Sequence, residues 1–250
     1  MTLPARCDDS GPPFGTLVFD CDSTLSAIEG IDELAGARKT EIAALTTRAM
    51  AGEIKLEDVY AKRLEMLAPD RAAVEELGRK YVAARLPHAV ELVAALHALE
   101  KRVVILSGGL RQAVLPLAAM LAIPEADVFA VEIYHDRAGV YAGFDELSPM
   151  TRSGGKLGVM RDIARADRKG GVAFVGDGIT DLEAAPAARR FVAFGGVVKR
   201  REVFERAVVT CDRADFAALL PLLVANDELE KLARSREFGS LVIAARNARR

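Results

Sequence analysis

Cysteine is scarce in this sequence, which has three in 250 residues: Cys7, Cys21 and Cys211. An odd and widely scattered set does not suggest a framework of disulfide bonds, and it fits a reducing compartment best. Cys21 has no histidine nearby in the sequence to activate its thiol, so we interpret it as a small packing residue. The N-terminal residues also lack the basic and then apolar pattern of a secretory signal. We therefore expect a cytoplasmic protein.

Long apolar runs and an excess of charge are missing too. The run at residues 216–225 is interrupted by Pro221 and is far short of the ~20 residues that a membrane-spanning helix needs. The 34 basic and 36 acidic residues leave a formal net charge of −2, which gives no strong attraction to nucleic acid or acidic membranes. The short basic cluster at residues 199–201 is interpreted as a solvated helix end. We expect a small-molecule substrate, no nucleic acid or membrane partner, and a monomer or homodimer.

Short apolar runs recur along the chain, and they end at polar or turn-forming residues. They lie at residues 16–19, 103–106, 172–175 and 191–194, with residues 208–209 as a fifth candidate. Such runs are typical of buried strands in a parallel sheet. Helical patterns lie between them, at residues 88–100, 155–166 and 200–206. This alternation predicts an α/β protein with a Rossmann-like open parallel sheet that has helices on both faces.

Two stretches interrupt the alternation of strands and helices. Residues 31–85 hold only helical patterns, at 40–50, 56–67 and 70–81. They predict a helical cap inserted after the first strand. Residues 128–134 and 140–144 flank turn-forming residues and predict a small β-hairpin. The expected domains are a core of residues 1–30 and 86–224, a cap of residues 31–85, and a C-terminal helical extension or tail of residues 225–250.

Short polar residues concentrate at the carboxyl ends of the predicted strands, where ligands bind in an open parallel sheet. They are Asp20 and Asp22, Ser107-Gly108-Gly109, and Asp177 and Asp181. Crowded carboxylates repel one another, so we expect a cation among them, and hard oxygen ligands favour Mg²⁺. A carboxylate nucleophile beside Mg²⁺ is a known route to phosphoryl transfer through an acyl phosphate. Ser107 and the glycine amides can hold phosphate oxygens at a helix start, and Lys156 can offset their charge.

Four motifs in this order resemble those of the haloacid dehalogenase-like phosphatases. They are Asp20-Cys21-Asp22-Ser23-Thr24, Ser107, Lys156, and Gly176-Asp177-Gly178-Ile179-Thr180-Asp181. The resemblance covers residues 14 to about 224. Further segments are similar to the branch of the family that hydrolyses phosphoserine. These segments are residues 29–35, Ala49-Met50, Arg63-Leu64, residues 141–145, residues 153–156 and residues 194–196.

The resemblance implies a role for each matching residue. Asp20 is expected to be the nucleophile and a ligand of the Mg²⁺ cofactor. Asp22 is expected to be the general acid and base, with its backbone carbonyl as a second ligand. Asp177 is the expected third ligand, and Asp181 supports the metal site from nearby. The residues expected to bind the phosphate end of the substrate are Ser107, Gly108, Gly109, Lys156 and Thr180.

The resemblance also implies a subsite for the amino-acid end of the substrate. Glu29 is expected to hold the ammonium group and Arg63 the carboxylate, while Met50 lines the pocket. The chemistry agrees independently, because a zwitterionic phosphate ester needs one anion and one planar cation. Both charged residues lie in or beside the predicted cap, where a lid can exclude water. Leu56 and Ala51 depart from the family pattern, so the fit of the lid is open.

The implied activity is hydrolysis of O-phospho-L-serine to L-serine and phosphate through an aspartyl-phosphate, the last step of serine biosynthesis. Two alternatives stay open. A phosphatase of the same mechanism can act on another small phosphomonoester. A phosphorylated receiver-type switch also uses carboxylates, Mg²⁺ and a lysine, but it needs a lasting acyl phosphate, which Asp22 as acid and base would shorten. Singly, residues 107–109 are also consistent with a plain turn, Lys156 with a surface lysine, and Glu29 and Arg63 with ordinary charged residues.

Overall fold

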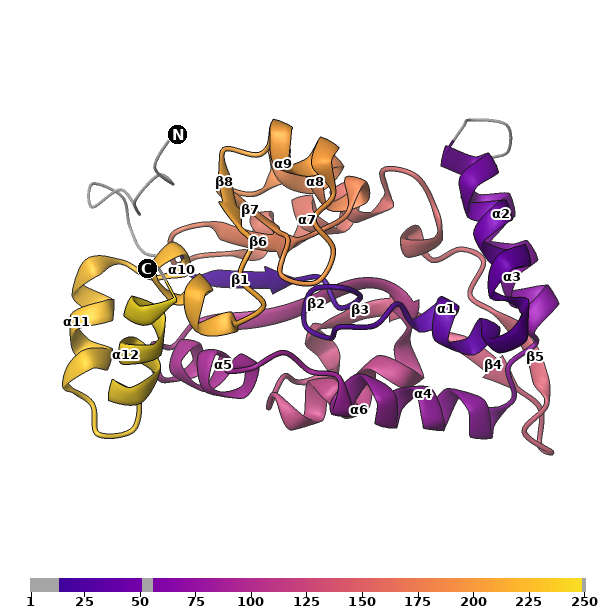
Figure 1. Cartoon of the computed structure of the whole chain (residues 1–250), viewed down its shortest axis with the longest axis horizontal. Coiled ribbons are helices and arrows are strands. Elements are labelled where there is room, and N and C mark those ends of the chain that lie inside the picture. Colours follow the sequence, from indigo (N-terminus) through magenta and orange to yellow (C-terminus); the bar gives the residue numbers. More distant parts are fainter. Residues whose placement is uncertain (1–13, 51–55, 249–250) are drawn as a thin grey trace.

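A six-stranded sheet forms the centre of the computed structural model, which describes residues 14–50 and 56–248 (Figure 1). The strand order is β3-β2-β1-β6-β7-β8, and every neighbouring pair is parallel. The strands are β1 (Thr16–Phe19), β2 (Arg102–Leu110), β3 (Val128–Val131), β6 (Val172–Gly176), β7 (Arg190–Phe194) and β8 (Val209–Cys211). The predicted α/β class and open parallel sheet are confirmed.

Helices cover both faces of the sheet. They are α5 (Ala89–Ala98), α6 (Arg111–Met120), α7 (Gly155–Ala166), α8 (Ile179–Ala184) and α9 (Arg201–Arg206). In Figure 1, α5 and α6 lie on one side of the sheet, and α7, α8 and α9 lie on the other. Leu17, Val18 and Phe19 of β1 are therefore fully buried on whichever face they point to. Burying each side chain of this size contributes about 1.5–3 kcal/mol, which explains the continuous apolar runs of the central strands.

The inserted segment after β1 is helical, as predicted. Its helices are α1 (Gly30–Ala35), α2 (Lys39–Met50), α3 (Leu56–Leu67) and α4 (Arg71–Ala83). In Figure 1, α1, α2 and α3 lie beyond the carboxyl end of β1, whereas α4 runs beside α6 under the sheet and packs against it. The division into core and cap domains stays a prediction. Ala51 and the side chains of Met50 and Leu56 lie outside the described part of the chain.

The predicted β-hairpin is shorter than expected. Residues 128–131 form β3, which pairs in parallel with β2 at the edge of the main sheet. Only β4 (Ile133–His135) and β5 (Tyr141–Phe144) form the antiparallel hairpin. The prediction that residues 128–134 form one hairpin strand was wrong, because a short apolar run has the same pattern in either kind of sheet.

The described residues after 224 are largely helical and belong to the folded body. They form α11 (Asn226–Arg234) and α12 (Gly239–Asn247), which follow α10 (Leu220–Leu223). Lys101 and Glu228 form a nearly buried ion pair of 2.6 Å that joins α11 to the start of β2. In Figure 1, α11 and α12 lie at the opposite end of the molecule from α2 and α3. Short 3₁₀ helices complete the chain, at Gly36–Arg38, Glu125–Asp127, Pro149–Thr151, Ala185–Ala187 and Phe216–Leu219.

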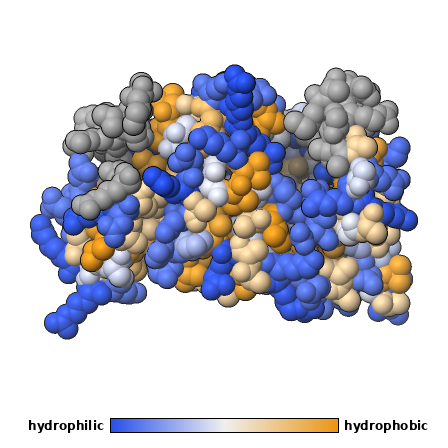
Figure 2. Space-filling view, viewed as in Figure 1, coloured by the Kyte–Doolittle hydropathy of each residue, from blue (hydrophilic) through white to orange (hydrophobic). Residues whose placement is uncertain are grey.

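The surface and the described cysteines can be compared with the predictions about membrane partners and about Cys21. Figure 2 shows a mainly hydrophilic face with apolar residues scattered across it. Among the described residues, no helix combines the length and the apolar character needed to cross a membrane. Cys21 and Cys211 are buried free thiols. Burial and the neighbouring Asp22 raise the pKa of Cys21 well above its usual value, and Cys21 packs in the core, which confirms its interpretation as a packing residue. The cytoplasmic location stays a prediction.

Candidate active site

A cavity of about 480 Å³ opens at the carboxyl ends of β1, β2 and β6. β1 lies centrally between β2 and β6, and the crevice outside such strand ends is where open α/β sheets bind ligands. Most predicted site residues line this cavity: Asp20, Asp22, Glu29, Arg63, Gly108, Gly109, Lys156, Asp177, Thr180 and Asp181. Ser107 is fully buried beside it. Met50 ends α2, and its side chain is outside the described part.

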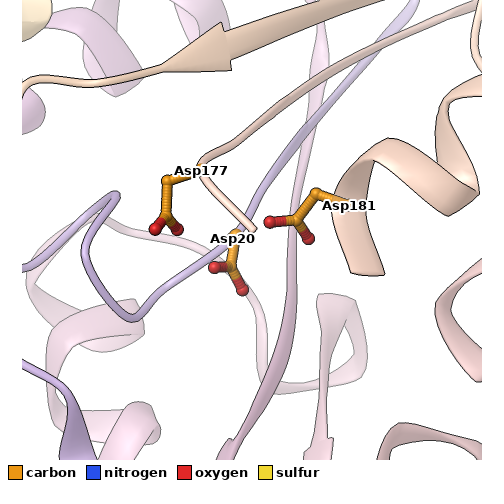
Figure 3. A group of neighbouring side chains, drawn as sticks. All are labelled: Asp20, Asp177 and Asp181. Atoms are coloured by element: carbon orange, nitrogen blue, oxygen red, sulfur yellow. The ribbon is translucent and has the colours of Figure 1, made fainter. Parts of the chain in front are cut away.

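Three buried aspartates converge at the base of the cavity (Figure 3). Asp20 follows β1, Asp177 follows β6, and Asp181 lies in the first turn of α8. Each offers a carboxylate oxygen within 4.8 Å of the other two. The close approach of Asp181 depends on Gly176, because a Cβ there would lie 2.5 Å from the Asp181 Cγ. We call Asp20, Asp177 and Asp181 the acidic triad.

The acidic triad is electrostatically strained when no cation is bound. Burial, followed by the nearby Asp181, raises the pKa of Asp20 well above its usual range, although Lys156 opposes the shift. Burial and Asp181 likewise raise the pKa of Asp177 to about 6, although Arg200 opposes the shift. The ionised forms of Asp20 and Asp177 are thus disfavoured by their surroundings. A small, hard cation would relieve this repulsion, and the donors are carboxylate oxygens of the type that such cations prefer.

Lys156 lies within the acidic triad, so the surface-lysine alternative is wrong. Its Nζ donates hydrogen bonds of 2.7 Å to Asp20 Oδ1 and 2.7 Å to Asp181 Oδ1. Burial alone would lower the pKa of Lys156, but Asp181 and Asp20 outweigh burial and raise it. The other Asp181 oxygen accepts a 2.9 Å bond from the Gly178 amide. Both Asp181 oxygens therefore accept hydrogen bonds, as both Asp177 oxygens do from Thr24 and Arg200, and the supporting role of Asp181 stays a prediction.

The segment of residues 107–109 continues β2 to Leu110, and α6 begins only at Arg111. The alternative of a plain turn is therefore wrong, and the helix start expected at this segment lies two residues after Gly109. The Ser107 hydroxyl donates a 3.3 Å bond to Asp22 Oδ2 and accepts a 2.9 Å bond from the Gly109 amide. The segment places two glycines on the cavity wall, where their missing side chains leave room for a ligand.

Arg63 has the features expected of an anion-binding residue. It lies on α3 and lines the cavity, with its guanidinium carbon 5.8 Å from the centre of the Tyr60 ring. Its Nε is buried and has no hydrogen-bond partner among the described residues. Burial lowers the pKa of Arg63, while Tyr60 and then Asp32 oppose that shift. A buried donor without an acceptor costs about 1–3 kcal/mol, and a substrate anion would remove this cost.

Glu29 lies just before α1 and already has two partners. Its Oε1 accepts a 2.7 Å bond from the Ser23 hydroxyl and a 3.0 Å bond from the Arg200 guanidinium. Burial, followed by Asp22, raises the pKa of Glu29 to about 7, against the effect of Ser23. A substrate ammonium group would have to share the Glu29 carboxylate with Arg200 or displace Arg200 from it.

Arg200 is a site residue that the sequence analysis missed. Its Nε donates a 2.9 Å bond to Asp177 Oδ2 while another nitrogen bonds Glu29, so it joins the acidic triad to the candidate ammonium subsite. Arg200 is 41% exposed and directly precedes α9, as the prediction of a solvated helix end has it, but that prediction did not include these two contacts. Its neighbours fit the prediction better, since Lys199 pairs with Asp212 and Arg201 with Glu205 on the surface. Glu29 lies 171 positions away, and no local pattern reports such a contact.

Tyr81 was also missed. It is a fully buried residue near the end of α4, and its hydroxyl donates a 2.6 Å bond to Asp22 Oδ1. At its position in the sequence it fits the apolar stripe of α4, so its spacing indicates only a core residue. A buried tyrosine hydroxyl needs a partner, but the sequence does not show which one.

The shifted pKa of Asp177 predicts how the metal-free protein responds to pH. The folded pKa of about 6 exceeds the usual 3.8, so the contribution of Asp177 to stability is fully present below pH 3.8 and is lost as the pH rises through 6. Asparagine cannot ionise, so Asp177→Asn should not lose this stability as the pH rises. We expect the variant to gain on the order of 2 kcal/mol relative to the wild type between pH 4 and pH 7.5. Urea unfolding in EDTA at both pH values measures the difference, and a difference that is independent of pH would contradict the prediction.

Comparisons with known proteins match most of this chain. The family model of the haloacid dehalogenase-like hydrolases matches residues 17–186, which include the acidic triad and Lys156. The chain is 40% identical over 191 residues to the phosphoserine phosphatase of Mus musculus, covering 76% of this chain and 85% of that protein. It is 38% identical over 195 residues to the phosphoserine phosphatase of Homo sapiens, with the same two shares.

The fold is similar to solved structures as well. A phosphoserine phosphohydrolase-like protein from Francisella tularensis subsp. tularensis SCHU S4 superposes with a TM-score of 0.70 at 27% identity. The superposition covers 88% of this chain and 99% of that one. The similarity therefore extends beyond the motifs to nearly the whole described fold.

Proposed function

This chain belongs to the haloacid dehalogenase-like hydrolases, among their phosphoserine phosphatases, and from that premise we propose that it hydrolyses O-phospho-L-serine to L-serine and phosphate. The observation that carries the substrate assignment is the buried Arg63 Nε, which lacks an acceptor and lines the same cavity as Asp20. A phosphate ester with a carboxylate at its other end could place its phosphorus beside Asp20 and give the Arg63 Nε an acceptor. Such a reaction would release free serine, and we propose that it is the last step of serine biosynthesis.

The proposed mechanism has two proton-coupled steps. Asp20 attacks phosphorus, the bond between phosphorus and the seryl oxygen breaks, and Asp22 gives its proton to that oxygen. Asp22, now a carboxylate, takes a proton from the water that attacks the phosphorus of the aspartyl-phosphate. Phosphate leaves, and both carboxyl groups return to their starting states. Lys156 bonds Asp20 throughout and offsets the negative charge of the phosphoryl group.

We propose Mg²⁺ as the cofactor of this site. Asp20, Asp177 and the backbone carbonyl of Asp22 would hold it, with Asp181 in support. A few oxygen ligands with room for water suit the small octahedral shell of Mg²⁺. When bound, Mg²⁺ would supply positive charge to the phosphate oxygens and to the nucleophile. The raised pKa values of Asp20 and Asp177 support the proposal: burial is their main cause, but the repulsion from Asp181 adds to both, and a cation would offset that repulsion.

A phosphate-release assay over a panel of esters tests the substrate assignment. The panel holds phosphoserine, phosphoethanolamine, glycerol phosphate and phosphothreonine, each with Mg²⁺ and purified full-length chain. We expect the highest kcat/KM for phosphoserine, because only it offers both charged groups without the extra methyl group of threonine. A tenfold preference for any other member would favour the alternative of another small phosphomonoester.

The receiver-type switch is not proposed, because the chain belongs to a family of hydrolases.

Two single substitutions probe the amino-acid subsite. Charge-assisted hydrogen bonds are worth about 1.5–3 kcal/mol, so loss of either partner should lower kcat/KM for phosphoserine roughly ten- to a hundredfold. Arg63→Ala should affect phosphoethanolamine little, because that ester has no carboxylate. Glu29→Gln should affect both esters, because both carry an ammonium group.

Glycerol phosphate is the control for these substitutions, since it carries neither group. Its kcat/KM should change less than about threefold in both variants. Equal losses on all three esters would show that the two residues hold the cavity together and do not select the substrate.

A further inference from the structure

Three donors within residues 14–50 and 56–248 hold the side chain of Asp22. Its Oδ1 accepts a 2.6 Å bond from the Tyr81 hydroxyl and a 2.7 Å bond from the Gly30 amide. Among the residues that the structure describes, its Oδ2 accepts one bond, the longer 3.3 Å bond from Ser107. A carboxyl oxygen that accepts two short bonds has little capacity left to carry a proton. The two oxygens of Asp22 are therefore unequal before any substrate binds.

The residues around Tyr81 leave space for its hydroxyl to reach Asp22. The ring is fully buried in the hydrophobic core, which fixes its orientation. A Cβ on residue 30 would lie 2.0 Å from the Tyr81 oxygen, and one on residue 109 would lie 3.0 Å from it. Glycine at both positions leaves the space that the hydroxyl occupies. The hydroxyl thus reaches Asp22 through a gap that any larger residue would close.

The backbone around Tyr81 is tied to the loop that carries Asp22. The Tyr81 carbonyl accepts a 3.1 Å bond from the Ser26 hydroxyl. Backbone bonds from Ala27 to Ala84, at 2.8 Å, and from Leu86 to Leu25, at 3.1 Å, fasten the end of α4 to the same loop. Donor and acceptor therefore sit on one rigid unit, as an orienting contact requires.

We propose that Tyr81 is a positioning residue for the hydrolytic reaction: with the Gly30 amide it holds Asp22 Oδ1, so that Oδ2 carries the transferred proton. This inference rests on the proposed function, in which Asp22 is the acid and base. A phenol has its proton at neutral pH and donates it to the carboxyl oxygen. Oδ2 then gives its proton to the seryl oxygen as the bond from that oxygen to phosphorus breaks. It later accepts a proton from the attacking water. Tyr81 itself neither gains nor loses a proton in either step.

The test compares two substrates that differ in their need for an acid. The seryl alkoxide is a poor leaving group and needs the proton of Asp22, whereas the acetate released from acetyl phosphate does not. Tyr81→Phe keeps the buried ring and removes only the hydroxyl. We expect kcat/KM to fall about ten- to a hundredfold for phosphoserine and less than about threefold for acetyl phosphate. Tyr134→Phe, on the exposed hairpin strand β4, is the matched control and should change neither value.

Gly30→Ala is a second, independent variant, because its methyl group would displace the Tyr81 hydroxyl while leaving tyrosine in place. It should show the same selective loss, and thermal unfolding of each variant checks that the fold is kept. A double-mutant comparison adds a third readout, since Tyr81→Phe should have no further effect on phosphoserine once Asp22→Asn has removed the acid.

Equal losses on both substrates, or no loss on phosphoserine, would overturn the proposal. Failure of the proposed function would look different. In that case the wild-type chain would not hydrolyse phosphoserine, and the same comparison would be made with the ester that it does hydrolyse.

Discussion

Asp20→Asn is expected to abolish hydrolysis, with kcat lower by at least about ten-thousandfold. The amide has almost the size of the carboxylate, and its oxygen can still accept the bond from Lys156, but it is not a nucleophile towards phosphorus. The fold should survive. Burial raises the pKa of Asp20 well above its usual range, so a neutral side chain at this position costs the folded state little.

Phosphate release from phosphoserine measures the effect, and thermal unfolding confirms that the variant is folded. Asp162→Asn is the matched control, because it makes the same change on the exposed side of α7 and should leave kcat unaltered. Substantial turnover by Asp20→Asn would contradict the covalent mechanism once mass spectrometry has excluded deamidation back to aspartate.

Removal of divalent metal is expected to have an effect of similar size. EDTA should reduce turnover to background and added Mg²⁺ should restore it. Ca²⁺ should restore little, because its larger and looser shell does not hold the reacting groups in a fixed octahedral arrangement. Full turnover after removal of metal would contradict the reading of the acidic triad as a cation site.

A binding readout separates the metal site from catalysis. Mg²⁺ at a hundredfold excess over its Kd should stabilise the folded chain by about 2.7 kcal/mol, which a thermal unfolding experiment detects. At one fixed Mg²⁺ concentration the gain should be larger at pH 8 than at pH 5.5, because Asp177, with a pKa of about 6, is mostly protonated at the lower pH and binds the cation more weakly. Asp177→Asn should lose most of the gain. If Mg²⁺ stabilised Asp177→Asn as much as the wild type, the cation would bind at a site without Asp177.

The central strands and their aspartates could be predicted because local sequence determines them. β1 is a buried apolar run that is followed by Asp20, and β6 is followed by Asp177. The apolar pattern that predicts each strand therefore lies directly before the aspartate that predicts the site. Strand type could not be predicted for residues 128–131, because a short apolar run fits the edge of a parallel sheet and a hairpin equally well.

The missed site residues share a physical cause. Arg200 and Tyr81 act through contacts with residues that are far apart in the chain, and their local patterns resemble a solvated cluster and a core stripe. The fold decides which buried hydroxyl meets which carboxylate. Side-chain chemistry and spacing alone cannot supply that information, whereas the order of the family motifs could indicate the general position of the cavity.

Transfer of the phosphoryl group from phosphoserine to Asp20 is the central claim, and one measurement tests it most directly. The chain is mixed with phosphoserine labelled in its phosphate group, quenched in acid, and digested to locate the protein-bound label. We expect a hydroxylamine-sensitive acyl phosphate on the peptide that contains Asp20, released during a chase at least as fast as kcat. Label on another side chain, or a label that leaves more slowly than the enzyme turns over, would contradict the claim.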